Sequence, residues 1–154
     1  MIAKQELQKI PVLCKSLKVA GHVVLDRTNR KSQLQTYKKG VSWLNQNVHL
    51  CTFAEGTRSR DGRLQPFKKG AFKMAEAVGA PIVPVSIKYA HLVNPVEYAW
   101  PMRSARSVSA EIVIGKPIET TGKDDEVVLR EVRQAIIDNL PECQHPAPGT
   151  PESA

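Results

Sequence analysis

One short segment of the chain gathers positive charge around glycine residues. It reads FAEGTRSRDGRLQPFKKGAF over residues 53–72, and Lys73 follows it. From Glu55 to Lys73 there are six basic and two acidic residues, so six minus two, or +4, of the chain's formal net charge of +7 lies there. The basic residues are Arg58, Arg60, Arg63, Lys68, Lys69 and Lys73. Arginine presents a planar fork that matches phosphate oxygens, and Gly56 lets the backbone approach a ligand closely. These residue types favour the binding of a phosphate group.

The composition of the whole chain fits one soluble globular domain. It has 154 residues, of which 42% are hydrophobic and 24% charged. The excess of positive charge favours an acidic partner, which could be nucleic acid, a phosphorylated small molecule or an anionic membrane surface. The three cysteines form no CxxC pair, which argues against a disulfide framework and against a zinc site. No run of 18 residues is predominantly apolar and free of charge, so we expect no transmembrane helix.

Hydrophobic periodicity predicts helices that alternate with strands. The predicted helices cover residues 4–19, 29–46, 69–78 and 123–139, and the predicted strands cover 22–26, 48–53, 80–89 and 107–115. This order is typical of an α/β domain, with a mainly parallel sheet flanked by helices. Because the first predicted element is a helix, we expect the sheet to lack a first strand. We expect residues 1–140 to form one partial domain and the proline-rich residues 141–154 to be a disordered tail.

The basic segment could also be a P-loop, a nucleic-acid surface or a plain surface turn. A P-loop requires GxxxxGK[ST], which this sequence does not contain. A nucleic-acid surface would use exposed aromatic side chains for stacking, whereas the spacing of Phe67 and Phe72 predicts that both are buried. A purely structural role would be a tight turn at Asp61–Gly62 whose arginines only face solvent. Charge alone does not separate this turn from a binding site.

Three sequence blocks in order resemble the glycerolipid acyltransferase family. They are GHVVLDR at Gly21–Arg27, FAEGTRS at Phe53–Ser59 and PIVPV at Pro81–Val85. The resemblance covers about residues 2–138. The best-known members of this family acylate lysophosphatidic acid with acyl-CoA or acyl carrier protein. Ala54 replaces the usual proline of the family, a change that affects the stiffness of the loop but no reacting group.

The resemblance implies a set of substrate-binding residues. They are Arg27, Glu55, Gly56, Thr57, Arg58, Ser59 and Lys68. By this resemblance Arg58 and Arg27 would hold the phosphate of the acceptor, and Lys68 would add a point charge. Glu55 would orient the glycerol or the neighbouring arginine, while Gly56 and Thr57 would shape the loop. The resemblance implies no metal and no cofactor, since acyl-CoA or acyl carrier protein is a substrate.

The catalytic block of the family is a histidine and an aspartate separated by four residues. None of His22, His49, His91 and His145 has an aspartate at that spacing. His22 and Asp26 are separated by three residues, and on a strand their Cα atoms would lie roughly 13 Å apart. We therefore assign no catalytic residue. We expect the block to lie upstream of Met1, in a longer parent protein, and this chain to be inactive alone.

The resemblance favours a 1-acylglycerol-3-phosphate O-acyltransferase of phospholipid biosynthesis. Its expected partners are lysophosphatidic acid, acyl-CoA and a membrane surface, without nucleic acid, and we expect membrane association on the intracellular side. One alternative is a non-catalytic homologue that binds phosphate or anionic lipid. Another, less favoured, is a basic nucleic-acid-binding module, which would bind with strong salt dependence.

Overall fold

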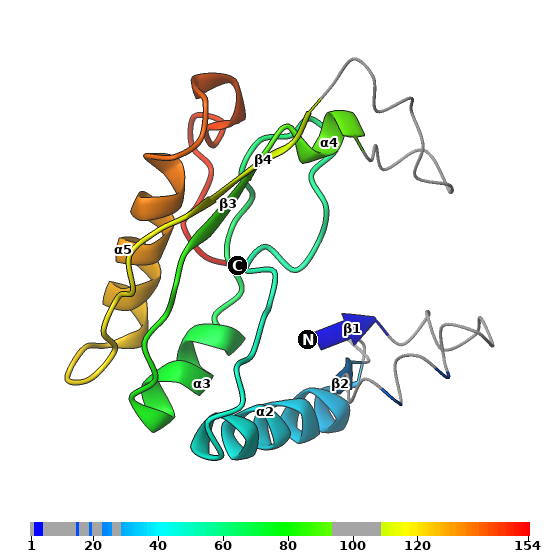
Figure 1. Ribbon diagram of the computed structural model, residues 1–154, viewed down its shortest axis with the longest axis vertical. Helices are drawn as coiled ribbons and strands as arrows, with labels where there is room; N and C mark the ends of the chain where they lie inside the picture. Colours follow the sequence, from blue (N-terminus) through cyan, green and yellow to red (C-terminus); the bar gives the residue numbers. More distant parts are fainter. Residues whose placement is uncertain (1, 5–14, 16–18, 20–22, 26–28, 94–108) are drawn as a thin grey trace. The chain divides into compact units, whose positions relative to one another are not determined.

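A computed structural model of the protein describes residues 2–4, 15, 19, 23–25, 29–93 and 109–154 (Figure 1). By its internal contacts the chain divides into two compact units, Met1–Thr52 and Phe53–Ala154. Each unit is described by itself below. The three sequence blocks are therefore split, because the first lies in the N-terminal unit and the other two lie in the C-terminal unit.

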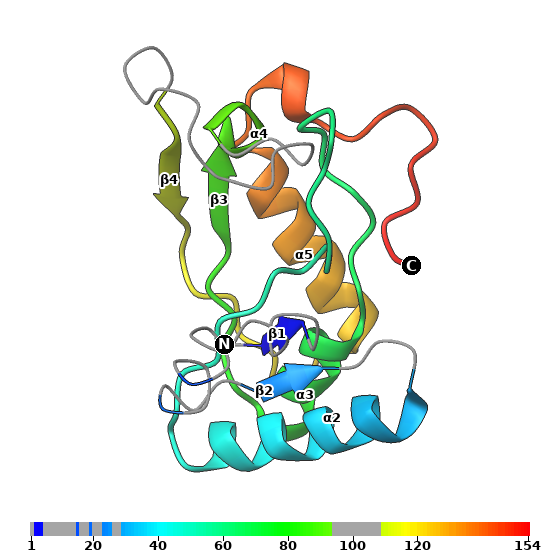
Figure 2. The same ribbon diagram turned by 90° about the vertical axis from the view of Figure 1, so that its right-hand side faces the viewer.

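The N-terminal unit contains a short parallel strand pair and one long helix. Strand β1 (Ile2–Lys4) pairs in parallel with β2 (Val23–Leu25) (Figure 2). Helix α2 (Arg30–Asn45) contacts β2. Asn29 caps this helix because its side-chain oxygen accepts a hydrogen bond from the backbone N–H of Lys31, at 2.9 Å. The strand predicted over 22–26 and the helix predicted over 29–46 are both confirmed.

The start of the chain differs from the sequence-based prediction. We expected a helix from residue 4 and no first strand, but β1 occupies Ile2–Lys4. A strand of three residues is too short to leave a periodic pattern, and only its ladder with β2 makes it a strand. Most of the helix predicted over 4–19 lies outside the described residues.

The strand predicted over 48–53 is not formed. No described strand pairs with this segment, and its side chains are largely exposed, Phe53 to 62%. Cys51 is exposed as well. Strand propensity without a neighbouring ladder does not produce a strand, because the backbone groups gain no partners. The apolar composition of residues 48–53 predicted a strand, but no strand in the described part of the chain pairs with them, so this prediction was wrong.

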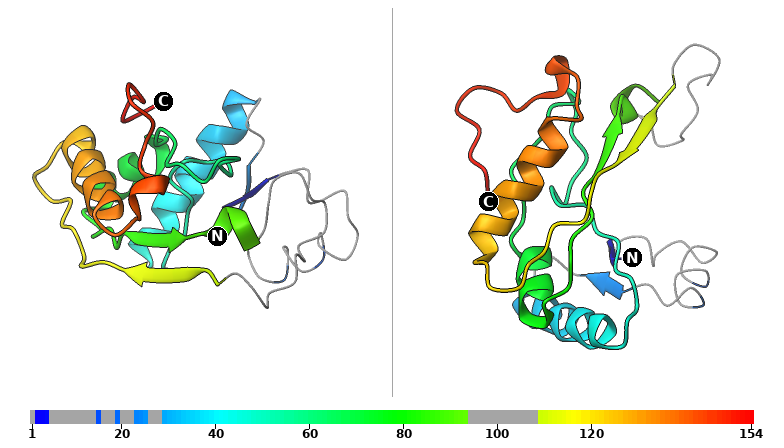
Figure 3. Two further views of the ribbon diagram at one scale, coloured as in Figure 1. Left: turned by 90° about the horizontal axis from the view of Figure 1, so that it is seen from above. Right: turned by 60° about the vertical axis from the view of Figure 1, so that its left-hand side comes forward.

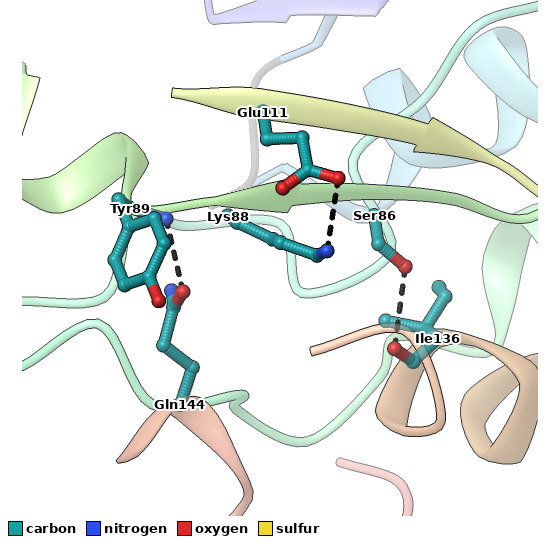
Figure 4. A network of polar contacts seen from close by, with 6 residues as sticks. All are labelled: Ser86, Lys88, Tyr89, Glu111, Ile136 and Gln144. Atoms are coloured by element: carbon teal, nitrogen blue, oxygen red, sulfur yellow. Dashed lines mark hydrogen bonds and ion pairs between the residues drawn. The ribbon is translucent and has the colours of Figure 1, made fainter. Parts of the chain in front are cut away.

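The C-terminal unit holds an antiparallel strand pair against a helix. Strand β3 (Val85–Lys88) pairs with β4 (Glu111–Ile114), and Val85 lies opposite Ile114. Helix α5 (Asp125–Ile137) runs along one face of this pair (Figure 3). The hydroxyl group of Ser86 donates a hydrogen bond to the carbonyl oxygen of Ile136, at 3.2 Å, which ties β3 to the end of α5 (Figure 4).

Three smaller elements complete the C-terminal unit. They are α3 (Gly70–Val78), α4 (Ala90–Val93) and the 3-10 helix η2 (Glu142–Gln144). The helices predicted over 69–78 and 123–139 are confirmed, and the predicted strands over 80–89 and 107–115 are shorter in the structure. The described strands thus form one parallel and one antiparallel pair. The α/β class is confirmed, whereas a mainly parallel sheet is not.

The hydrophobic core of the C-terminal unit joins the basic segment to α5. Its buried members are Leu64, Phe67, Phe72, Val128, Leu129 and Val132. The rings of Phe67 and Phe72 stack with their centroids 6.1 Å apart, and these side chains are only 1% and 3% exposed. Burial of each such side chain contributes roughly 1.5–3 kcal/mol. The prediction that both phenylalanines are buried is therefore confirmed.

The other face of the β3–β4 pair carries exposed apolar side chains. They are Val85, Ile87, Ile112 and Ile114, which are 38–71% exposed. Val85 lies opposite Ile114 and Ile87 opposite Ile112, so the four side chains share one face. Ser86 points to the opposite face, where α5 packs.

The segment from Pro141 to the end does not match the predicted disordered tail. Within it η2 forms, and the carbonyl oxygen of Gln144 accepts a hydrogen bond from the backbone N–H of Leu64, at 3.0 Å. Farther along, Phe67 exchanges backbone hydrogen bonds of 3.0 Å with Glu152 and Ala154. The proline-rich composition hid these contacts because proline removes donors without preventing the remaining backbone groups from pairing.

Candidate functional site

The basic segment forms a loop whose two ends are held together. The backbone N–H of Gly56 donates to the carbonyl oxygen of Phe53, at 3.0 Å, and closes a turn in which Gly56 has φ +69°. The backbone N–H of Lys68 donates to the carbonyl oxygen of Ala54, at 2.8 Å. This bond places Ala54, in the FAEGTRS block, beside Lys68, just before the start of α3.

The middle of the loop is the tight turn that Asp61–Gly62 predicted. One carboxylate oxygen of Asp61 accepts hydrogen bonds from the hydroxyl of Ser59, at 2.7 Å, and from the backbone N–H of Arg63, at 3.1 Å. These two bonds lower the pKa of Asp61. Ser59 is thus engaged in holding the turn, which is consistent with a structural task inside the loop.

Glu55 is the partly buried carboxylate of the loop. Its Oε2 atom accepts a hydrogen bond from the backbone N–H of Gln65, at 3.0 Å. Burial raises the pKa of Glu55, while the bond from Gln65 and the positive charge of Arg133 act in the opposite direction. Burial dominates, so the group is held in a position where its ionised form depends on nearby positive charge.

The other predicted site residues fall into two groups. Thr57, Arg58 and Lys68 have exposed side chains on the same loop as Glu55 and Gly56. Arg27 lies outside the described residues. The structure therefore places every predicted site residue of the C-terminal unit on one loop that bears positive charge toward solvent.

Two residues that pack against the loop were missed in the sequence. Arg133 on α5 is 4% exposed, and its Nη1 donates to the carbonyl oxygen of Gln65, at 2.9 Å. Gln144 is also 4% exposed. A signal for Arg133 existed, since it follows Leu129 by four residues and so lies on the apolar stripe of the helix. We find no comparable signal for Gln144, which lies in the proline-rich segment.

Gln144 joins the loop to the end of β3. Its Nε2 donates to the carbonyl oxygen of Gly62, at 3.2 Å, and its Oε1 accepts from the backbone N–H of Tyr89, at 2.9 Å (Figure 4). Both ends of the buried amide are therefore used, and the turn of the loop is fixed relative to the strand pair.

In the described part of the chain, no group of three or more His, Cys, Asp or Glu side chains comes together as a metal site would require. The exposed guanidinium and ammonium groups of the loop can recognise an anion. The partly buried Glu55 carboxylate next to them can accept hydrogen bonds from hydroxyl groups.

Comparison with known proteins defines the class. A family model described as acyltransferase matches residues 1–88, which is more than half of the 154-residue chain. The chain belongs to the acyltransferase family. This assignment confirms the resemblance drawn from the three sequence blocks.

Individual relatives agree with the family. The chain is 35% identical over 159 residues to a 1-acyl-sn-glycerol-3-phosphate acyltransferase of Limnanthes douglasii, an alignment that covers 99% of this chain and 54% of the relative. It is 33% identical over 146 residues to the protein of the same name from Saccharomyces cerevisiae, covering 91% of this chain and 47% of the relative. The chain spans about half the length of the curated relatives it matches.

A solved structure shares the fold. It is the crystal structure of the 1-acyl-sn-glycerophosphate (LPA) acyltransferase PlsC from Thermotoga maritima. The TM-score is 0.69 at 27% sequence identity, and the match covers 88% of this chain and 52% of that chain. The described elements of the chain thus belong to an acyltransferase fold.

Proposed function

We propose that this chain is the acceptor-binding part of a 1-acylglycerol-3-phosphate O-acyltransferase. The enzyme transfers an acyl group from acyl-CoA, or from acyl carrier protein, to lysophosphatidic acid and forms phosphatidic acid in phospholipid biosynthesis. The observation that carries the proposal is the loop of residues 53–69, in which the backbone bond from Lys68 to Ala54 places a lysine beside the FAEGTRS block. The names of the relatives support the choice of substrate.

Each loop residue has a defined task in this proposal. Arg58 and Lys68 hold the phosphate of the acceptor. Glu55 accepts a hydrogen bond from the glycerol or orients an arginine, while Gly56 and Thr57 shape the turn and Ser59 holds it through Asp61. Charge-assisted bonds to phosphate are among the strongest that side chains form, so the headgroup dominates recognition.

The chemical step requires a general base. The acceptor hydroxyl loses its proton to that base and attacks the carbonyl carbon of the acyl thioester. A new ester bond forms, the carbon–sulfur bond breaks, and the thiol leaves with a proton. No histidine of this sequence has an aspartate at the spacing of the family's dyad. We therefore assign acceptor binding to these residues and proton transfer to none of them.

The substrates suggest where the protein works. The acceptor and the product of the proposed reaction are membrane lipids, so we infer association with the intracellular side of a membrane. A net charge of +7 supports attraction to anionic lipid headgroups. Among the described helices, none combines the length and the apolar character that crossing a bilayer would require.

Two alternatives make different predictions. A homologue that only binds anionic lipid would use the same loop without turnover. A nucleic-acid module would use exposed aromatic side chains for stacking. Of the three phenylalanines in the basic segment, Phe67 and Phe72 are buried, and only Phe53 is exposed. Such a module would bind DNA or RNA with strong salt dependence.

The test is acyl transfer by the native protein that carries this sequence. We expect phosphatidic acid to form from acyl-CoA and lysophosphatidic acid, and much less diacylglycerol to form when the acceptor is a monoacylglycerol without phosphate. Arg58→Gln should abolish this preference, whereas Arg130→Gln, which removes the same charge from an exposed position on α5, should leave it unchanged. Tight binding of lysophosphatidic acid without turnover would support the non-catalytic alternative instead.

A further inference from the structure

Arg133 is a buried charged residue beneath the basic loop. It lies on α5 with only 4% of its surface exposed. Burial lowers the pKa of its guanidinium group, which shows that the position disfavours a charge. Replacement of buried ionic groups by apolar side chains is often neutral or stabilising. A buried arginine here is therefore better explained by what it does to its neighbours than by packing.

The guanidinium group of Arg133 interacts with the loop and with the C-terminal segment. Its Nη1 donates to the carbonyl oxygen of Gln65, at 2.9 Å, and its guanidinium carbon lies 5.0 Å from the centroid of the Phe67 ring. The negative charges that act on it are those of Glu55 on the loop and Glu152 on the C-terminal segment. The positive charge of Arg133 therefore faces the loop.

Gln65 connects this arginine to Glu55. Its carbonyl oxygen accepts from Arg133, while its own N–H donates to Oε2 of Glu55, at 3.0 Å. Both backbone groups of one residue are therefore used, one toward α5 and one toward the carboxylate. If Arg133 were removed, the carbonyl oxygen would lose its partner and the backbone that holds Glu55 would lose an anchor.

We propose that Arg133 is a positioning residue for acceptor binding, which fixes the Glu55 carboxylate through the backbone of Gln65 and through its own buried charge. This inference rests on the proposed function, since it assumes that Glu55 meets the acceptor. Arg133 itself has no contact with the acceptor in this arrangement.

The ionisation of Glu55 supports the same assignment. Burial raises the pKa of Glu55, and the charge of Arg133 opposes that rise. The groups that act on Glu55 are the Gln65 N–H and Arg133, and Glu152 acts on Arg133 from the C-terminal segment. We therefore expect loss of Arg133 to raise the pKa of Glu55 further and to favour its neutral form.

The first experiment follows the Glu55 carboxyl carbon by NMR during a pH titration of the chain. We expect Arg133→Met to move the titration of Glu55 to higher pH and Arg133→Lys, which keeps a positive charge, to move it less. Arg130→Met is the matched control, since it removes an exposed arginine from the same helix and should leave the Glu55 titration unchanged. An unchanged Glu55 titration in folded Arg133→Met would overturn the proposal.

A second measurement does not depend on the folding of an Arg133 variant. In the unsubstituted chain, the side-chain nitrogen resonances of Arg133 should shift with the titration of Glu55, and this shift should vanish in Glu55→Gln. Arg133 resonances that ignore the titration of Glu55 would also overturn the proposal.

Binding of lysophosphatidic acid in detergent micelles then separates this inference from the proposed function. We expect Arg133→Met to weaken binding about tenfold or more. The pH below which binding is lost should also move to a higher value. In a Glu55→Gln background, Arg133→Met should have neither effect. If the unsubstituted chain does not bind the lipid, the proposed function fails whatever the titrations show. If it binds and Arg133→Met binds equally well over the whole pH range, only the role of Arg133 fails.

Discussion

Replacement of Gly62 by alanine tests how tightly the basic loop is packed. Gly62 has φ +79°, a conformation that residues with a side chain rarely adopt. A Cβ atom there would lie 2.7 Å from Cγ of His91 and closer still to Nδ1 and Cε1 of that ring. The ring would have to move away, and the carbonyl oxygen of Gly62, which accepts from Gln144, would move with the turn.

The magnitude follows from two separate terms. The left-handed backbone costs an alanine about 1–2 kcal/mol, and the reduced freedom of the unfolded chain returns about 0.4–1 kcal/mol. Gly149 has the same φ of +79°, and a Cβ there would meet nothing within 4 Å. Gly149→Ala should therefore lower the free energy of unfolding by about 1 kcal/mol, whereas Gly62→Ala should lower it by roughly a further 1–3 kcal/mol for overpacking.

Urea denaturation of the two variants measures this difference directly. The free energy of unfolding is extrapolated to water, with the slope m checked for equality between variants. A third variant, His91→Ala, supplies the double-mutant cycle, because removal of the ring should reduce the effect of Gly62→Ala to that of Gly149→Ala.

Equal destabilisation by Gly62→Ala and Gly149→Ala would refute this reasoning. So would an effect of Gly62→Ala that stays the same in the His91→Ala background. Either result would mean that the backbone at Gly62 does not pack against the ring of His91, and the described position of the Asp61–Gly62 turn would be wrong.

Three further predictions concern the charge, the packing and the exposed face of the C-terminal unit. Burial raises the pKa of Glu55 above its ordinary value of 4.5, so the native state binds a proton at Glu55 more tightly than the unfolded state does. The free energy of unfolding should therefore fall as pH rises through the raised pKa. In Glu55→Gln, the urea midpoint should depend less on pH over this range. Gln144→Ala should destabilise the chain by about 1–2 kcal/mol, since two partly buried backbone groups lose their partner. Gln134→Ala at an exposed site should change stability by less than about 0.5 kcal/mol. Equal melting temperatures of the two variants would contradict this prediction. The double variant Ile112→Thr/Ile114→Thr removes two apolar side chains from the exposed face of the β3–β4 pair, so the isolated chain should self-associate less in analytical ultracentrifugation. An unchanged sedimentation coefficient would show that this face does not mediate self-association.

Sequence reasoning succeeded where a pattern is local. The helices over 30–45 and 125–137 follow from their apolar spacing. In the structure the side chains of Asn29 and Asp124 cap their first turns. The turn at Asp61–Gly62 follows from residue types that favour it. The acyltransferase family follows from the order of three short blocks, although none of them would suffice alone.

The failures concern contacts between distant residues. The apolar segment at 48–53 has the composition of a strand but no described partner, whereas Ile2–Lys4 has a partner and becomes one. The C-terminal segment has a disordered composition, but its backbone pairs with Leu64 and Phe67. No periodicity encodes these pairings, because each depends on what the fold brings alongside.

The candidate site shows the same division. The residues from Glu55 to Ser59 could be chosen from the sequence, since they belong to one motif. The residues that hold the motif in place, Arg133 and Gln144, lie far along the chain from it and became visible only through their hydrogen bonds to Gln65 and Gly62.

The central claim is that the loop of residues 53–69 holds the phosphate of a lysophospholipid. The most direct measurement is the dissociation constant of the chain for lysophosphatidic acid, compared with that for a monoacylglycerol of the same acyl chain, in the unsubstituted chain and in Arg58→Gln. We predict that the phosphate strengthens binding and that Arg58→Gln weakens lysophosphatidic acid binding about tenfold to a hundredfold, with monoacylglycerol binding unchanged. Equal affinity for both lipids, or an Arg58→Gln variant that binds as the unsubstituted chain does, would contradict the account.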